Sequence, residues 1–197
     1  MTRAKWRLPS EKELKSHLRN SHREAIGERL ERYKYIWQEF GPPMGMILIG
    51  GISASLALEE LRLCYIDGYY LACVLLAQIF IENSLGGLYI MAGDERTAEK
   101  GFAQLIDKAL MDNLIDPLLA NHFHELRRMR NTYVHPNAGL DKRTVMGRML
   151  EKYEDGKTFE SPKDFAEEDA RQAIEILVDF LRYSSRQGEH PWEPPRD

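Results

Sequence analysis

From Tyr69 to about Met91 the sequence predicts a helix that is apolar on nearly every face, and this segment constrains the fold more than any other. Glu82 is its single charged residue. A helix that is apolar all round is stable only when other helices surround it. A carboxylate enclosed in this way is costly unless a cation pairs with it. We therefore expect an arginine from residues 121–136 to lie beside Glu82.

The rest of the chain also predicts helices and shows no strand-like alternation. Ser10 followed by Glu13 is typical of a capping box, and a long amphipathic helix then runs to Phe40. Apolar positions three and four residues apart predict one further helix that ends near Ile66. They also predict helices over residues 98–110, 117–135, 143–153 and 162–186. The uncharged stretch 40–58 contains four glycines and two prolines, which makes it a poor membrane span.

These helices indicate an all-α bundle with a single core. Residues 1–43 form a basic amphipathic helical arm in this interpretation, and residues 44–186 form the bundle. The tail, 187–197, contains three prolines and is expected to be poorly ordered. A chain of 197 residues is long enough to bury a substantial core.

Composition and charge are those of an ordinary soluble protein. The net charge is −4, which argues against a protein that coats nucleic acid. Residues 1–35 carry ten Lys or Arg against five Asp or Glu, so the rest of the chain carries −9. The basic arm is either a solvated helix face, which we favour, or a phosphate contact.

The cysteines and the N-terminus indicate the compartment. Cys64 and Cys73 lie in apolar runs, which predicts reduced core thiols rather than a disulfide. The N-terminus is charged and no apolar segment follows it, so we expect no signal peptide. A cytoplasmic protein without membrane association is the expectation.

Residues 121–136 combine an apolar helix face with an unusual set of polar groups. Asn131 and His135 are four residues apart and share a face, on which Arg128 and His124 also fall. Pro136 biases His135 away from helical geometry. Arg130 lies about 140° from His135 on an ideal helix, but unwinding before the proline would bring the two together.

Other catalytic constellations are missing from the sequence. His122 and His124 are two residues apart and point to nearly opposite sides of a helix, so they cannot share a metal. We find no glycine-rich phosphate loop, no serine nucleophile elbow and no CxxC pair. Neither a metal nor a cofactor is expected.

An arginine followed by a polar residue and, after three more residues, a histidine near the end of a late helix resembles the motif of the HEPN superfamily. Here these residues are Arg130, Asn131 and His135. The likeness extends to the segments 57–85 and 105–110 and covers roughly residues 50–185. Over this range the chain resembles an uncharacterised bacterial branch of the superfamily.

The resemblance implies a four-helix up-down core with short additional helices, and a metal-independent endoribonuclease that acts as a homodimer. Arg130 and His135 would be the catalytic pair and Asn131 the polar position of the motif. Arg130 can bind the scissile phosphate, and His135 can move a proton between the 2′-hydroxyl and the leaving oxygen. Such proteins include toxins and defence effectors, so an antitoxin or other protein partner is a further expectation. RNA is the expected substrate.

Structural interpretations of the same residues stay open. Arg130 is alternatively the partner of Glu82 or a cap for helix-end carbonyls, and His135 a cap for the same terminus. Arg128 and His124 are either phosphate contacts or parts of a solvated face. The alternative function is a non-catalytic HEPN-like module that dimerises or binds a nucleotide, RNA or a protein partner.

Overall fold

The computed structural model describes residues 10–41, 50–135, 141, 144–154, 156 and 161–187, without the side chains of 17, 18 and 21–24. Every regular element in these ranges is a helix, which confirms the all-α prediction. Residues 1–9 of the arm, Pro136 and the tail from 188 onward lie outside the described residues.

The helix bounds follow local signals closely. They are α1 (Glu11–Phe40), α2 (Gly51–Asp67), α3 (Tyr70–Met91), α4 (Glu95–Ala98), α5 (Phe102–Met111), α6 (Pro117–Val134), α7 (Val145–Glu154) and α8 (Pro162–Gln187). The capping box of α1 is present, with Glu13 Oε2 accepting from Ser10 N at 2.7 Å. Gly68 ends α2 in the left-handed region, at φ +79°, and α3 follows directly.

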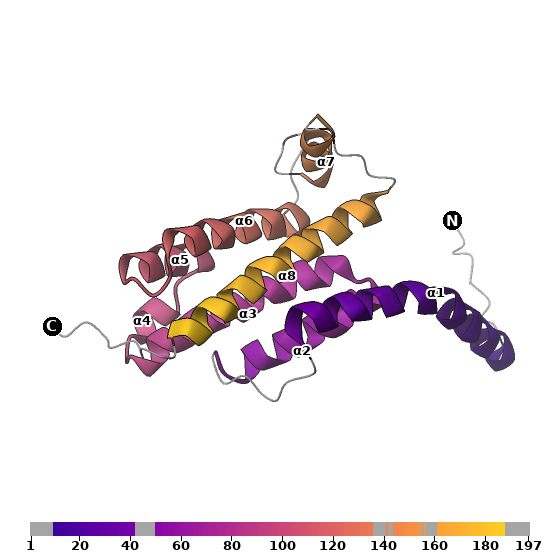
Figure 1. Cartoon of the computed structure of the whole chain (residues 1–197), viewed down its shortest axis with the longest axis horizontal. Helices are drawn as coiled ribbons and strands as arrows, with labels where there is room; N and C mark the ends of the chain where they lie inside the picture. The colour runs from indigo at the N-terminus through magenta and orange to yellow at the C-terminus, as the bar shows by residue number, and fades with distance from the viewer. Residues whose placement is uncertain are drawn as a thin grey trace, which may run out of the picture.

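The central position of α3 is confirmed. It packs against α2, α8, α6, α5 and α4, and α2 and α6 run in one direction while α3 and α8 run in the other (Figure 1). Among the described helices, α3 alone is long and apolar enough to span a membrane, but half of its most apolar window is buried inside the protein. This helix is the core around which the others are arranged.

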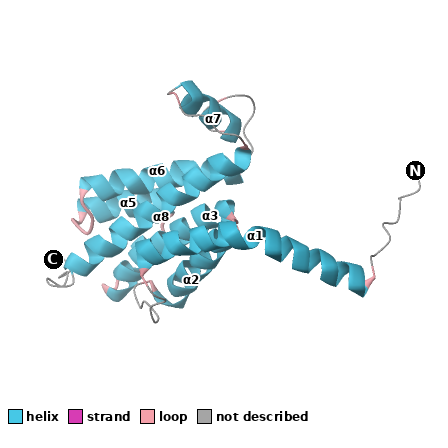
Figure 2. Cartoon of the chain, turned by 45° about the vertical axis from the view of Figure 1, so that its right-hand side comes forward, coloured by secondary structure: helices cyan, strands magenta, loops and turns pink. Residues whose placement is uncertain are grey.

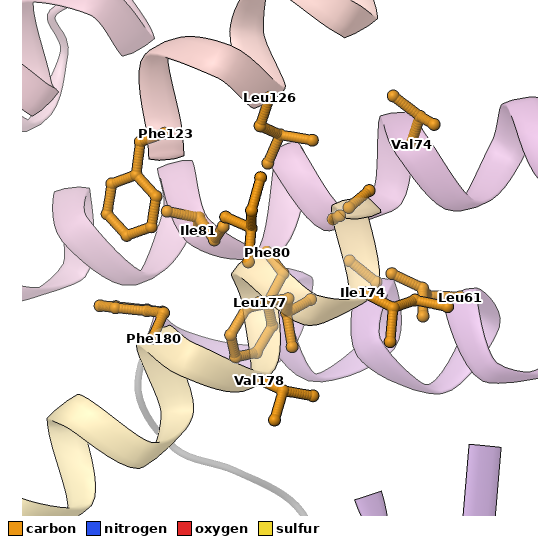
Figure 3. Close-up of a cluster of buried hydrophobic side chains, with 14 of the residues drawn as sticks. Leu61, Val74, Phe80, Ile81, Phe123, Leu126, Ile174, Leu177, Val178 and Phe180 are labelled. Atoms are coloured by element: carbon orange, nitrogen blue, oxygen red, sulfur yellow. The ribbon is translucent and has the colours of Figure 1, made fainter. Parts of the chain in front are cut away.

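The core is continuous between α3, α6 and α8 (Figure 3). Phe180 of α8 meets Phe123 of α6 edge-on at 5.4 Å between ring centroids, and Phe80 of α3 at 6.4 Å. Aromatic pairs in this geometry contribute about 0.5–1.5 kcal/mol beyond the area they bury. Cys73 is a fully buried free thiol in the same core.

Two helices stand partly outside the bundle. The N-terminal half of α1 projects away from it, and α7 lies above the ends of α6 and α8 (Figure 2). The expected long helix is present as α1, but much of its apolar stripe is not buried against the bundle. Trp37 and Leu30 are about half exposed, whereas Arg32 is buried.

Candidate functional site

The local sequence of α6 explains why the helix is regular and which of its side chains are exposed. Asp116 caps the N-terminus by accepting a 2.8 Å hydrogen bond from the backbone N–H of Leu119, and Pro117 occupies the first turn. The buried positions recur every three or four residues along one side: Leu119, Phe123, Leu126 and Met129. The polar side chains between them are therefore held on the opposite side.

At the other end, α6 ends at Val134, two residues before Pro136. His135 has extended backbone geometry, φ −111° and ψ 124°, and its N–H donates to Asn131 O at 3.1 Å. This conformation is expected of a residue that precedes proline. Regular helix continues through Val134, so the side chains of residues 130 and 131 keep their helical positions.

A cleft of about 880 Å³ lies between this end of α6 and helices α7 and α8. Arg128, Asn131 and His135 all line it, so the predicted shared face opens onto one space. The other charged and polar groups on its walls are Glu125, Arg127, Thr132, Arg148, Glu151 and Gln172. The cleft therefore combines arginines, a histidine and two amides with two carboxylates.

Arg130 takes a different position from its two predicted partners. It is half-buried and is not among the residues that line the cleft. Its Nη1 donates to Asn131 Oδ1 at 3.2 Å, so the arginine and the asparagine are in direct contact. Because the helix does not unwind before residue 135, Arg130 and His135 are not brought onto one wall of the cleft within the protomer.

Glu82 is half-buried rather than enclosed. Its Oε2 accepts a hydrogen bond from Gln78 Nε2 at 3.1 Å, one turn earlier on α3. Among the ion pairs of the described residues, none joins Glu82 to Arg130. Partial solvation and the amide donor remove the need for the cation that the sequence led us to expect.

His124 is on the shared helical face but lies nearer the start of α6, next to α5. Its Nε2 lies 3.2 Å from Asp107 Oδ1, and its side chain is 25% exposed. It does not line the cleft. Of the two predicted phosphate contacts, Arg128 therefore opens onto the same space as His135, and His124 faces a carboxylate instead.

The strongest polar network beside the cleft centres on Asp169, which sequence reasoning missed. Asp169 lies on α8 and is fully buried. Arg148 of α7 binds it through both guanidinium nitrogens, at 2.6 and 2.7 Å, and the Tyr133 hydroxyl donates to it at 2.8 Å. Lys152 adds a cation at 3.6 Å. The available sequence signal was the spacing: Asp169 lies four residues after the apolar Phe165 and therefore falls on the same, buried face of the helix.

This network fixes the walls of the cleft. The Tyr133 ring packs against the hydrophobic core, while its hydroxyl donates to the Asp169 carboxylate. Burial and the adjacent Asp169 carboxylate raise the pKa of Tyr133 well above its usual value, so the phenol stays protonated as a donor. One buried carboxylate thus connects α6, α7 and α8.

Within the described residues, no group of three or more His, Cys, Asp or Glu side chains is placed to hold a metal ion. Comparison of the chain with protein-family models, curated proteins and solved structures found no match.

Proposed function

We propose that the protein is a metal-independent endoribonuclease of the HEPN type that acts as a homodimer in the cytoplasm. The observation that supports this best is the shared cleft of Arg128, Asn131 and His135, with Arg130 hydrogen-bonded to Asn131 at its edge. A role as a toxin or defence effector, controlled by an antitoxin or other protein partner, is part of the proposal.

The chemistry requires only these side chains and the RNA itself. The 2′-oxygen attacks the adjacent phosphorus, and the bond to the 5′-oxygen breaks, which leaves a 2′,3′-cyclic phosphate. His135 takes the proton of the 2′-hydroxyl and passes it to the 5′-oxygen that leaves. An arginine stabilises the charge that develops on the phosphate. The internal nucleophile restricts the reaction to RNA.

The place of Arg130 outside the cleft makes the dimer an essential part of the mechanism. In the proposed assembly, the motifs of two copies meet across a two-fold axis, and the scissile phosphate lies between Arg130 of one copy and His135 of the other. Asn131 then holds the guanidinium in position through the hydrogen bond already described. Neither copy is complete without the other.

The test is cleavage of RNA by purified protein in the presence of EDTA. His135→Ala and Arg130→Ala should each abolish cleavage, while Arg96→Ala, an exposed arginine on α4, should leave it unchanged. Circular dichroism checks that the variants fold. Cleavage that persists in both variants would show that these residues are not catalytic.

A mixing experiment tests the composite site. The two inactive variants, Arg130→Ala and His135→Ala, are combined and allowed to exchange subunits. A mixed dimer has one intact pair of Arg130 and His135, so part of the activity should return. If the mixture stays inactive although mixed dimers form, the two groups do not come from different copies.

The second candidate is a non-catalytic module that binds RNA, a nucleotide or a protein partner. It is favoured by the two carboxylates, Glu125 and Glu151, that line the same cleft. In that case wild-type protein does not cleave RNA, and Arg130→Ala lowers the melting temperature because its contact with Asn131 is structural. Loss of cleavage with an unchanged melting temperature supports the enzyme instead.

A further inference from the structure

An apolar groove of about 620 Å³ lies between α1, α2 and the C-terminal half of α8. Buried core residues form part of its lining, among them Ile36 of α1, Leu58 of α2 and Val178 of α8. The groove shares no residue with the cleft between α6, α7 and α8. It is therefore a second surface, which the proposed chemistry does not use.

The α2 wall of the groove carries a row of large apolar side chains that are open to solvent. Ile52, Leu56 and Leu63 are 69%, 51% and 57% exposed. Together with Glu59 they recur every three or four residues, so they form one stripe along the helix. At 1.5 Å per residue the stripe is about 16 Å long, which matches about three turns of a second helix laid beside it.

The α1 wall lines the same groove with aromatic side chains. Tyr33 and Trp37 are each nearly half exposed, and their ring centroids lie 6.1 Å apart. Soluble proteins rarely expose continuous apolar surface of this kind except where a partner binds. A groove with aliphatic side chains on one wall and aromatic side chains on the other is suited to receive the apolar face of an amphipathic helix.

Two carboxylates on the groove walls form no ion pair among the described residues. Glu59 lies within the apolar stripe of α2, and Glu39 is half-buried near the end of α1. Complementary charge selects one partner over another and suppresses partners of like charge. These two anions therefore favour a ligand that brings positive charge to the groove.

The two arginines of the groove are already bound to the protein itself. Arg62 donates a 3.0 Å hydrogen bond to the Gly41 carbonyl, and its guanidinium lies 5.6 Å from the centre of the Phe40 ring. Arg182 lies 3.8 Å from the Asp179 carboxylate. The charge that remains for a ligand is therefore negative. This opposes an acyl chain with an anionic head, which would otherwise suit an apolar groove.

We propose that the groove binds a basic amphipathic helix of a protein partner. The apolar side chains of that helix lie between Leu56 and Leu63 of α2 and Trp37 of α1. Its lysines or arginines pair with Glu39 and Glu59. The proposal concerns binding alone and does not depend on the ribonuclease activity. A partner in the groove also leaves uncovered the cleft at which the two-fold assembly is proposed.

A synthetic helical peptide is the probe. It has about 18 residues, with leucines three and four residues apart and lysines elsewhere, and a matched peptide carries glutamates in place of the lysines. The protein carries Trp6→Phe and Trp192→Phe, so that Trp37 is its only tryptophan. The lysine peptide should move the Trp37 emission to shorter wavelength and bind about tenfold more tightly than the glutamate peptide. Equal affinities, or calorimetric binding without a change in emission, would overturn the proposal.

A leucine substitution tests the apolar contacts. Leu56→Asn should weaken binding of the lysine peptide about tenfold. Leu118→Asn is the matched control, because Leu118 is similarly exposed but lies at the start of α6, outside the groove. Dodecanoate represents the acyl-chain alternative and should not change the Trp37 emission at the concentrations used for the peptide. Tighter binding of dodecanoate than of the lysine peptide would identify a lipid site and overturn the proposal.

Charge reversal tests the role of the two carboxylates. Glu39→Lys combined with Glu59→Lys should reverse the preference, so that the glutamate peptide binds more tightly. Glu95→Lys combined with Glu99→Lys changes the net charge equally on α4, outside the groove, and should leave the preference unchanged. Circular dichroism checks that both double variants keep their helical content. The same change of preference in both would show that net charge, and not the groove, selects the peptide.

Discussion

The hydroxyl of Tyr133 donates a 2.8 Å hydrogen bond to Asp169, a carboxylate with no exposed surface on a neighbouring helix. Arg148 binds the same carboxylate through both of its terminal nitrogens. The three residues belong to α6, α8 and α7, so one buried anion links α7 to both neighbouring helices.

Asp169→Asn should destabilise the protein strongly. The asparagine amide cannot accept hydrogen bonds from both guanidinium nitrogens of Arg148. The positive charge of Arg148 also loses its negative partner. Removal of one partner of a buried ion pair costs about 3–5 kcal/mol. Urea denaturation measures the free energy of unfolding. Asp179→Asn is the control, because its 3.8 Å pair with Arg182 is largely exposed and should contribute less than about 1 kcal/mol.

Tyr35 of α1 and Tyr70 of α3 should make the protein sensitive to alkali. Burial is the largest cause that raises the pKa of Tyr70 to about 12, followed by its hydrogen bond to Glu167. Burial likewise raises the pKa of Tyr35 to about 12. Unfolded tyrosine titrates near 10. Stability is therefore complete below about pH 10 and falls between about pH 10 and 12, where only the unfolded chain releases these protons.

Tyr35→Phe separates this effect from general alkaline unfolding. The Tyr35 hydroxyl is buried and has no hydrogen-bond partner among the described residues. Its removal should leave stability at pH 7 unchanged or increased by up to about 1 kcal/mol. The loss of stability above pH 10 should become less steep, which denaturation at several pH values measures. A lower stability at pH 7 would contradict this account.

Gly50→Ala should cost more than Gly93→Ala, although both glycines have left-handed backbone geometry. Their φ angles are +79° and +81°. A Cβ at Gly50 would lie 2.7 Å from the Ser84 backbone, whereas one at Gly93 meets nothing within 4 Å. Both substitutions carry the conformational cost of about 1–2 kcal/mol. Thermal denaturation should show a further ~1–3 kcal/mol for Gly50→Ala from the close contact of α2 with α3.

Arg32→Ala should loosen α1. The guanidinium is buried and donates to the Ile66 carbonyl, and hydrogen bonds of charged groups contribute about 1.5–3 kcal/mol. We expect destabilisation of that size and faster proteolysis within α1. Lys34→Ala removes an exposed pair with Glu31 and should change stability by less than about 1 kcal/mol. Equal effects of the two substitutions would show that Arg32 is not the anchor.

Most of the fold was predictable because helical periodicity reports burial directly. The apolar segment 69–91 had to be central, and the cap at Ser10 and the proline at 117 marked helix starts that the structure contains. The face of α1 that packs against the bundle was not predictable. It depends on the carbonyl of Ile66, which only the tertiary fold brings to Arg32.

Those features of the candidate site that follow from the regular geometry of α6 were predictable from the sequence. Regular helical geometry placed Asn131 and His135 on one face, and both line one cleft. The contacts of His124 with Asp107 and of Arg148 with Asp169 come from other helices, so no local pattern reveals them. For Arg130, the expectation depended on unwinding that the helix does not undergo.

The bidentate ion pair of Arg148 also determines the electrostatics of the cleft. Its charge is neutralised by Asp169, so Arg127 and Arg128 are balanced by Glu125 and Glu151, and the formal charge of the walls is close to zero. A polyanion bound there would displace few counterions. Its affinity should therefore change little with salt concentration, unlike that of proteins that bind nucleic acid through many phosphate contacts.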